Sequence, residues 1–120
     1  MRLQESLKIQ SLLKTYGKKH KSFDHVINLG SGNIERLKKT KPWVSQNVFN
    51  PLEKSGAKVI HVDAEGFPGV DIVQDLSLPN ALKFCDKLKG SKLFILANNI
   101  KYHFFKLYSI NRKFITTFYQ

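Results

Sequence analysis

The feature that most constrains the fold is a short apolar segment that runs directly into two closely spaced glycines. Residues 26–29 read Val-Ile-Asn-Leu, and Gly30, Ser31 and Gly32 follow at once. Glycine at such a point lets the backbone turn sharply and lets a ligand approach without a Cβ in the way. We therefore predict a strand over 26–29 whose carboxyl end forms part of a binding site.

Three further segments predict strands. Residues 59–62 and 70–74 are short and rich in β-branched side chains, which favour strands. Residues 93–97 form a continuous apolar run, typical of a strand buried on both faces of a sheet. These segments, with 26–29, supply the expected sheet.

Helical spacing predicts helices over 2–16 and 77–90, whereas Pro42 and Pro51 are expected to interrupt any longer helix in 33–57. The apolar face expected for the first helix consists of Leu3, Leu7, Leu12, Leu13 and Tyr16. The order of helices and strands implies parallel pairing with right-handed crossovers. The predicted fold is thus α/β, a Rossmann-like parallel sheet of about four strands in the order 3-2-1-4.

The charge of the chain is strongly basic and uneven. Lys and Arg number 20 against 9 Asp and Glu, a net charge of +11. Residues 1–22 carry +5 and residues 101–120 carry +4, with no acid in the latter. Such an excess favours polyanions, which would make nucleic acid a partner, but solvated basic ends are the preferred explanation.

The apolar runs and the cysteine content indicate the cellular compartment in which the protein is expected. No apolar run reaches the roughly 18–20 residues that span a bilayer, and the start lacks the apolar stretch of a signal peptide. Cys85 is the single cysteine and cannot form an internal disulfide. We therefore expect no membrane association and a reduced, cytoplasmic setting.

The composition changes after residue 100. Residues 101–120 hold seven of the fourteen aromatic residues and no Gly, Pro, Asp or Glu. No clean helical or strand period runs through them. We predict a domain over 1–103, with a helix in 1–20, and an atypical basic and aromatic tail over 104–120. We also predict that residues 101–120 are not the native continuation of the fold.

An acid follows the second predicted strand. Asp63 would lie beside Gly30 at the carboxyl edge of a doubly wound sheet, where it can accept hydrogen bonds from both ribose hydroxyls of a nucleoside. Glu65 is the alternative if the register differs by two residues. A turn aspartate without a ligand is the structural alternative.

Other polar residues follow the third and fourth strands. Asp75 can accept from an exocyclic adenine amine, or it can simply cap the next helix, and Leu76 can pack on the adenine face. Asn98 and Asn99 would face the ligand crevice after the last strand, and His103 is either there or in a solvent-exposed loop.

These motifs, in this order, resemble the class I S-adenosylmethionine-dependent methyltransferases over about residues 23–103. The resemblance rests on 26–32 as the glycine-rich first motif, 59–63 as the second strand with its ribose acid, 69–79 as the third strand and adenine-side loop, and 96–103 as the fourth strand and the start of its helix. It implies S-adenosylmethionine as cofactor. The implied cofactor-binding residues are Gly30, Ser31, Gly32, Asp63, Asp75, Leu76 and Asn98.

Two departures from the family stand out. Lys101 and Tyr102 occupy the place where an acid often precedes the histidine, and nothing after 103 resembles the fifth strand and closing hairpin of the seven-stranded sheet. We therefore expect an incomplete methyltransferase fold, and an inactive truncated fragment stays open as an alternative. The sequence assigns no catalytic residue and no metal ligand, and it does not identify the methyl acceptor.

Two other functions stay open. A nicotinamide-dependent oxidoreductase fragment would share the glycine-rich turn, but the third glycine of its fingerprint is replaced by Glu35. A non-catalytic basic protein that binds nucleic acid or another macromolecule would use the charge and the aromatic tail. No recognised nucleic-acid-binding motif supports the latter.

Overall fold

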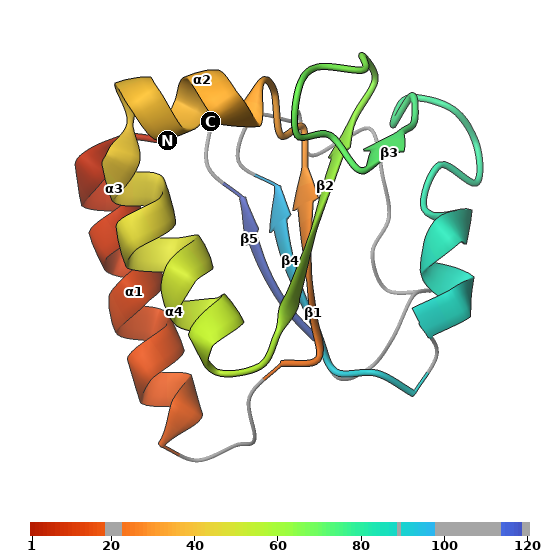
Figure 1. The fold of residues 1–120 in the computed structure, drawn as a ribbon. Coiled ribbons are helices and arrows are strands. Elements are labelled where there is room, and N and C mark those ends of the chain that lie inside the picture. The colour runs from red at the N-terminus through yellow and green to blue at the C-terminus, as the bar shows by residue number, and fades with distance from the viewer. Residues whose placement is uncertain (19–22, 89, 98–113, 119–120) are drawn as a thin grey trace.

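The computed structural model of the chain describes residues 1–18, 23–88 and 90–97, and the backbone of 114–118. Helices and strands alternate as an α/β fold requires (Figure 1). In chain order the elements are α1 (Leu3–Gly17), β1 (His25–Leu29), α2 (Ile34–Thr40), α3 (Pro42–Val44), the π-helical segment η1 (Ser45–Phe49), α4 (Asn50–Lys54), β2 (Lys58–Asp63), β3 (Ile72–Val73), the 3-10 helix η2 (Lys83–Leu88), β4 (Leu93–Ala97) and β5 (Phe114–Phe118).

The sheet is parallel and has the order β3-β2-β1-β4-β5. Its first four strands confirm the predicted order 3-2-1-4 and make an incomplete Rossmann-like fold. The strands are in register, so that Leu29 of β1 lies opposite Val62 of β2 and Ala97 of β4. The carboxyl ends of the strands therefore lie together at the same end of the sheet, at the top of Figure 1.

A fifth strand extends this sheet beyond the expected edge. β5 pairs in parallel with β4 over its full length, so β4 is not the edge strand that the predicted order 3-2-1-4 implies, and 114–118 continue the sheet. The residues are Phe-Ile-Thr-Thr-Phe, whose β-branched and aromatic side chains favour strands. Within 101–120 these five residues are too few to produce a clean strand period, so no strand was predicted there.

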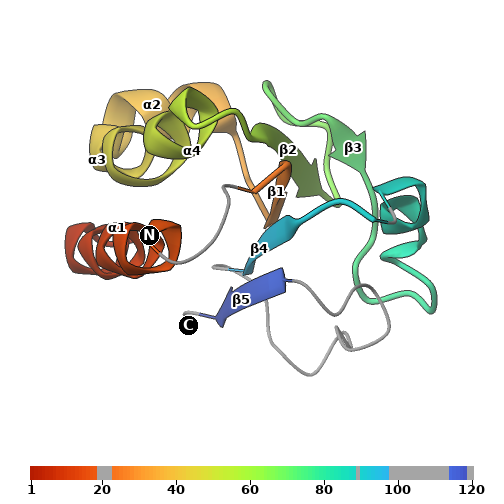
Figure 2. The ribbon, with the colours of Figure 1, turned by 90° about the horizontal axis from the view of Figure 1, so that it is seen from below.

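One face of the sheet is covered by α1, α3, η1 and α4, which lie together on one side in Figure 2. Their apolar side chains meet those of β1 and β4 in what we call the helix-side cluster. Its buried members are Met1, Ile9, Phe23, Val26, Val44, Val48, Phe49, Leu52, Ala57, Phe94 and Leu96. This cluster fixes α1 against the sheet.

The α1 helix is confirmed, but its buried side differs from the expected one. Ser6 and Ile9 are fully buried, whereas Leu3, Leu7 and Leu12 are 44%, 46% and 41% exposed. Residues 6, 9, 13 and 16 follow the helical period and face the sheet, so the three leucines flank that side.

The region of Pro42 and Pro51 is more helical than expected. Pro42 begins α3 and Pro51 lies in the first turn of α4, with η1 joining the two. The backbone N–H of Asn50 donates to Ser45 O, five residues earlier. This wider turn carries the helical path up to Pro51, which has no N–H to donate.

The opposite face of the sheet lacks the long helix predicted over 77–90. Turns run through 76–82, and η2 follows as a 3-10 helix. Asn80 has a φ of 60°, in the left-handed region, which stops an α-helix. This segment covers the loop-side cluster, whose buried members are Ile27, Leu29, Val62, Leu76, Ala81, Leu93, Ile95 and Ala97.

Candidate functional site

The glycine-rich loop lies at the carboxyl end of β1, where the strand order of the sheet reverses between β1 and β4. Ligands of open α/β sheets bind in the crevice outside this point. Gly30 and Gly32 have φ values of 69° and 66°, a conformation that side chains other than glycine adopt with strain. The turn predicted from the sequence is therefore formed.

Hydrogen bonds tie this loop to the end of β2. The N–H groups of Gly30 and Ser31 both donate to Val62 O, at 2.8 and 3.0 Å. The N–H of Gly32 donates to Asp63 Oδ2 at 2.8 Å. Gly30, Ser31, Gly32 and Asp63 thus lie together, as the sequence predicted.

Asp63 is half-buried, and its other carboxylate oxygen accepts from the N–H of Glu65 at 3.0 Å. A carboxylate oxygen has two lone-pair positions, so each one retains capacity for a second donor. Asp63 can hold the loop and still accept from a ligand hydroxyl. The side chain of Glu65 is exposed, and the geometry favours Asp63 as the acid of the site.

Two N–H groups in the first turn of α2 already donate to protein acceptors. The N–H of Ile34 donates to Pro68 O at 3.0 Å, and that of Arg36 donates to the side-chain oxygen of Asn33 at 3.0 Å. Gly69 permits the first contact, because a Cβ there would lie 2.6 Å from Ile34 Cβ. The loop after β2 therefore occupies the place where a phosphate would meet a helix N-terminus.

The N-terminal residue covers the carboxyl end of β1. Met1 is 8% exposed. It borders a cavity of about 20 Å³ shared with Asn28, Gly30, Ser31 and Leu96. Such a volume holds about one water molecule. A ligand moiety at this position requires Met1 to move.

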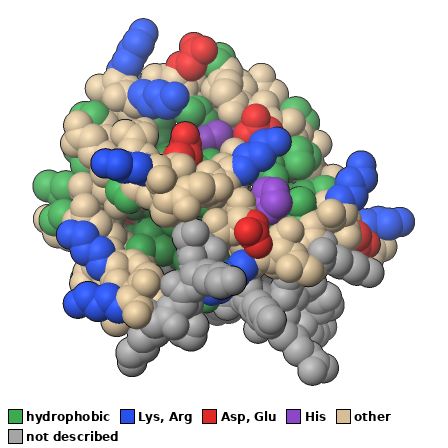
Figure 3. Space-filling model, turned by 60° about the horizontal axis from the view of Figure 1, so that its bottom comes forward, with side chains coloured by type: hydrophobic (Ala, Val, Ile, Leu, Met, Phe, Trp, Pro, Cys, Tyr) green, Lys and Arg blue, Asp and Glu red, His purple; other side chains and the backbone are tan. Residues whose placement is uncertain are grey.

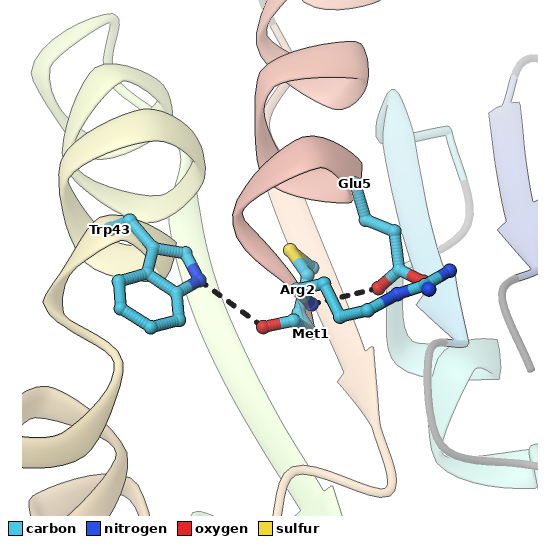
Figure 4. Close-up of polar contacts among 4 residues, drawn as sticks. All are labelled: Met1, Arg2, Glu5 and Trp43. Carbon is cyan, nitrogen blue, oxygen red and sulfur yellow. Dashed lines mark hydrogen bonds and ion pairs between the residues drawn. The ribbon is translucent and has the colours of Figure 1, made fainter.

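Two interactions fix this N-terminus (Figure 4). The indole N–H of Trp43 donates to Met1 O at 3.2 Å, and Arg2 forms hydrogen bonds and an ion pair with the Glu5 carboxylate. Burial lowers the pKa of the α-amino group, and the charge of Lys41 acts in the same direction. Trp43 is therefore a direct neighbour of the segment that closes the crevice.

A polar pair that the sequence analysis missed crosses β1 and β2. Asn28 Nδ2 lies 3.0 Å from His61 Nδ1, and the His61 ring packs edge-on against Phe49, with centroids 5.2 Å apart. Burial lowers the pKa of His61, while the charges of Asp71 and Glu53 oppose that shift. The polar Asn28 within an otherwise apolar strand was the available clue.

The remaining candidates are placed differently. Asp75 is exposed, and one of its carboxylate oxygens accepts from the N–H of Ser77 at 2.9 Å and from its hydroxyl at 2.6 Å. These bonds lower the pKa of Asp75, and they make it the cap of the following turn. Leu76 is 8% exposed within the loop-side cluster.

Asp75 is nevertheless close to Asp63 along the sheet. The backbone N–H of Gln74, the residue before Asp75, donates to Asp63 O at 2.8 Å.

Asn98, Asn99 and His103 lie outside the described residues. Among the residues that are described, no group of His, Cys, Asp and Glu has a metal-binding arrangement. Nor does any helix in that part of the chain have the length and apolarity to cross a membrane.

Comparison with known proteins adds no relative to this picture. No family model, no curated protein and no solved structure matches the chain.

Proposed function

We propose that this chain is the S-adenosylmethionine-binding part of a class I methyltransferase that acts on an acceptor still to be identified. The observation that carries the proposal is the hydrogen bonding of backbone N–H groups in the loop between β1 and α2. Its N–H groups at Gly30, Ser31 and Gly32, and the first one of α2, all donate to protein acceptors. Asp63 retains acceptor capacity beside them. This arrangement suits a nucleoside without phosphate groups.

The same observation argues against a nicotinamide dinucleotide. A pyrophosphate is bound by N–H groups that the loop and the helix N-terminus leave free. Here Gly32 N is taken by Asp63 and Ile34 N by Pro68. A pyrophosphate would have to displace both acceptors and break these two hydrogen bonds.

The residues of this chain would bind and orient the cofactor. Asp63 would accept from the ribose hydroxyls, the glycines of the loop would allow close approach, and Asp75 would accept from the adenine amine. When bound, S-adenosylmethionine supplies an activated methyl group for transfer to a nucleophile. The contribution of the protein would be positioning and the exclusion of water, with Met1 displaced to admit the methionine end.

The compartment follows from the single thiol. Cys85 is free and buried, which suits a reducing environment, and we place the protein in the cytoplasm on that basis. Nucleic acid is a less favoured partner that rests on the net charge of +11. A filter-binding titration with RNA over increasing salt tests it separately, because phosphate-driven retention falls steeply with salt.

A titration of the full chain with S-adenosylhomocysteine tests the proposal. Trp43 is the only tryptophan and contacts Met1, so its fluorescence should change as the crevice opens, and calorimetry gives the affinity. NADH should bind more weakly. Asp63→Ala should weaken binding about 10- to 100-fold, the scale of hydrogen bonds to a charged group, about 1.5–3 kcal/mol.

Matched variants separate binding from folding. Glu65→Ala removes the neighbouring exposed acid and should leave affinity unchanged. Asp63→Asn keeps one oxygen acceptor for Gly32 N and should fold like the wild type, which thermal melting checks. Equal affinity of the wild type and Asp63→Ala, or tighter binding of NADH, would overturn the proposal.

A further inference from the structure

A second hollow lies at the opposite end of the sheet from the glycine-rich loop. It has a volume of about 300 Å³ and lies between the C-terminal half of α1 and α4. Phe23, just before β1, and Ser55, just before β2, belong to its lining. The cavity is therefore at the amino ends of these strands, away from Asp63.

The side chains that line this cavity are mostly apolar, and several of them are fixed by packing against other parts of the protein. Leu13 of α1, Leu52 of α4 and Phe23 contribute side chains that also pack in the helix-side cluster. Phe23 stacks on Tyr16, with ring centroids 4.8 Å apart and planes 12° apart, and Lys92 Nζ lies 4.8 Å from the Tyr16 ring centroid. The volume is at the lower end of the range for small-molecule sites, about 300–1,000 Å³. A small apolar body fits such a space.

Among the described residues that line the cavity, Lys14 is the one that carries a charge. Gln10 and Lys14 line the cavity from successive turns of α1, and no Asp or Glu is among its lining residues. Within the part of the chain that the structure describes, neither side chain has a hydrogen-bond or ion-pair partner. Residues four apart lie on the same helix face, so an amide donor and an ammonium donor lie one above the other.

Two adjacent donors of this kind match a carboxylate. The ammonium of Lys14 offers a charge-assisted hydrogen bond and the amide of Gln10 a second one, while a bound cation would meet repulsion from Lys14. The carbonyl end of α1 weakly disfavours an anion at an exposed site. The direct Lys14 contact offsets this effect because it is closer to the carboxylate.

We propose that the cavity between α1 and α4 binds a small apolar molecule that carries a carboxylate, with the apolar body against Leu13, Phe23 and Leu52 and the carboxylate at Gln10 and Lys14. Figure 3 brings this lower end of the molecule forward, and it shows hydrophobic side chains exposed among Lys and Arg side chains. This site is independent of the proposed cofactor site.

Calorimetric titration of the full chain with octanoate, and with 1-octanol as the uncharged control, tests this proposal. Octanoate should bind more tightly than octanol. Lys14→Gln should weaken octanoate binding about 2- to 5-fold, as expected for a rim ion pair, and leave octanol binding unchanged. Lys8→Gln is the matched control, because Lys8 is an exposed lysine of the same helix outside the cavity lining.

Filling the cavity provides the second test. Gly17 lines it, its φ is not in the left-handed region, and a Cβ there would meet nothing within 4 Å. Gly17→Phe should abolish binding of both probes, and Leu52→Phe does the same from α4 if the first variant folds poorly. Octanoate binding that survives both substitutions, or that is absent in the wild type, overturns the site. Equal affinity for the two probes, unaffected by Lys14→Gln, overturns carboxylate recognition.

Discussion

The two faces of the sheet are covered in different ways. The helix-side cluster is covered by α1 and by the nearly continuous helical path from Pro42 to Lys54. The loop-side cluster is covered by turns and by η2, on the other side of the sheet in Figure 2. Both clusters are well buried, so burial alone does not distinguish them.

The difference lies in the backbone of each cover. On the loop side the hydrogen bonds span three residues, as from Ala81 N to Leu78 O at 3.2 Å and from Cys85 N to Leu82 O at 2.9 Å. Such short turns have poorer hydrogen-bond geometry than an α-helix and can rearrange in smaller units. A helix moves as a body, so a void beneath it is harder to close. The two faces should therefore respond differently to the same defect.

Leu93 and Leu96 of β4 test this difference most directly, because they are each 1% exposed and belong to opposite clusters. Leucine-to-alanine substitutions in cores cost about 2–5 kcal/mol, and the cost rises with the cavity that remains. We expect Leu96→Ala, under the helices, to cost about 4–5 kcal/mol and Leu93→Ala about 2–3 kcal/mol. Urea unfolding followed by circular dichroism measures both free energies. Equal costs, or the reverse order, would contradict the contrast between the faces.

Gly69→Ala probes how α2 is held over the end of the sheet. Gly69 has a φ of 89°, and an added Cβ would overlap Ile34. Backbone strain alone costs about 1–3 kcal/mol, and the overlap adds to it. Gly56→Ala is the control, because Gly56 has a φ of 105° but a Cβ there meets nothing within 4 Å. Thermal melting should show the larger loss for Gly69→Ala; similar losses would mean that the Ile34 contact is unimportant.

The smallest expected effect is a pH dependence on the helix side. Burial lowers the pKa of His61 below its ordinary value of 6.5, so the unfolded chain takes up the proton first as the pH falls. The stabilisation is complete above pH 6.5 and is lost as the pH falls from there through the folded pKa. Protonation also removes the acceptor that Nδ1 offers to Asn28.

His61→Gln should flatten this dependence. Unfolding free energies of the wild type and the variant give the comparison when they are measured from about one pH unit above to about one and a half units below the ordinary His pKa. A wild-type stability that rises as the pH falls through this window would show that the charge of Asp71 outweighs burial.

Local sequence was sufficient for the first four strands and for the grouping of Asp63 with the glycine-rich loop, but not for β5. A few neighbouring residues determine both the strand β4, through its apolar run, and the turn after β1, through its glycines. The position of Asp63 then follows from the strand order. These features need no knowledge of distant contacts. The predicted sheet order and the grouping of Asp63 with the loop depend only on them.

Other features depend on residues far apart in the chain. The pairing of Asn28 with His61 requires the exact register of β1 and β2, and the position of Met1 beside Trp43 requires the packing of α1. The helix predicted near Asn80 failed for another reason, since its apolar spacing is equally compatible with a 3-10 turn on a sheet. Propensity cannot decide between these when tertiary packing contributes more.

The buried cysteine of η2 also makes the opening of this segment measurable by chemical labelling. Cys85 is its single cysteine and is 3% exposed, and burial raises the pKa of its thiol to about 11. Because the thiolate is the reactive form, an alkylating reagent at neutral pH meets almost no target while the turn is closed. Each labelled molecule therefore records one opening of the loop-side cover. Mass spectrometry of the labelled fraction over time would read the lifetime of that closed state without any engineered probe.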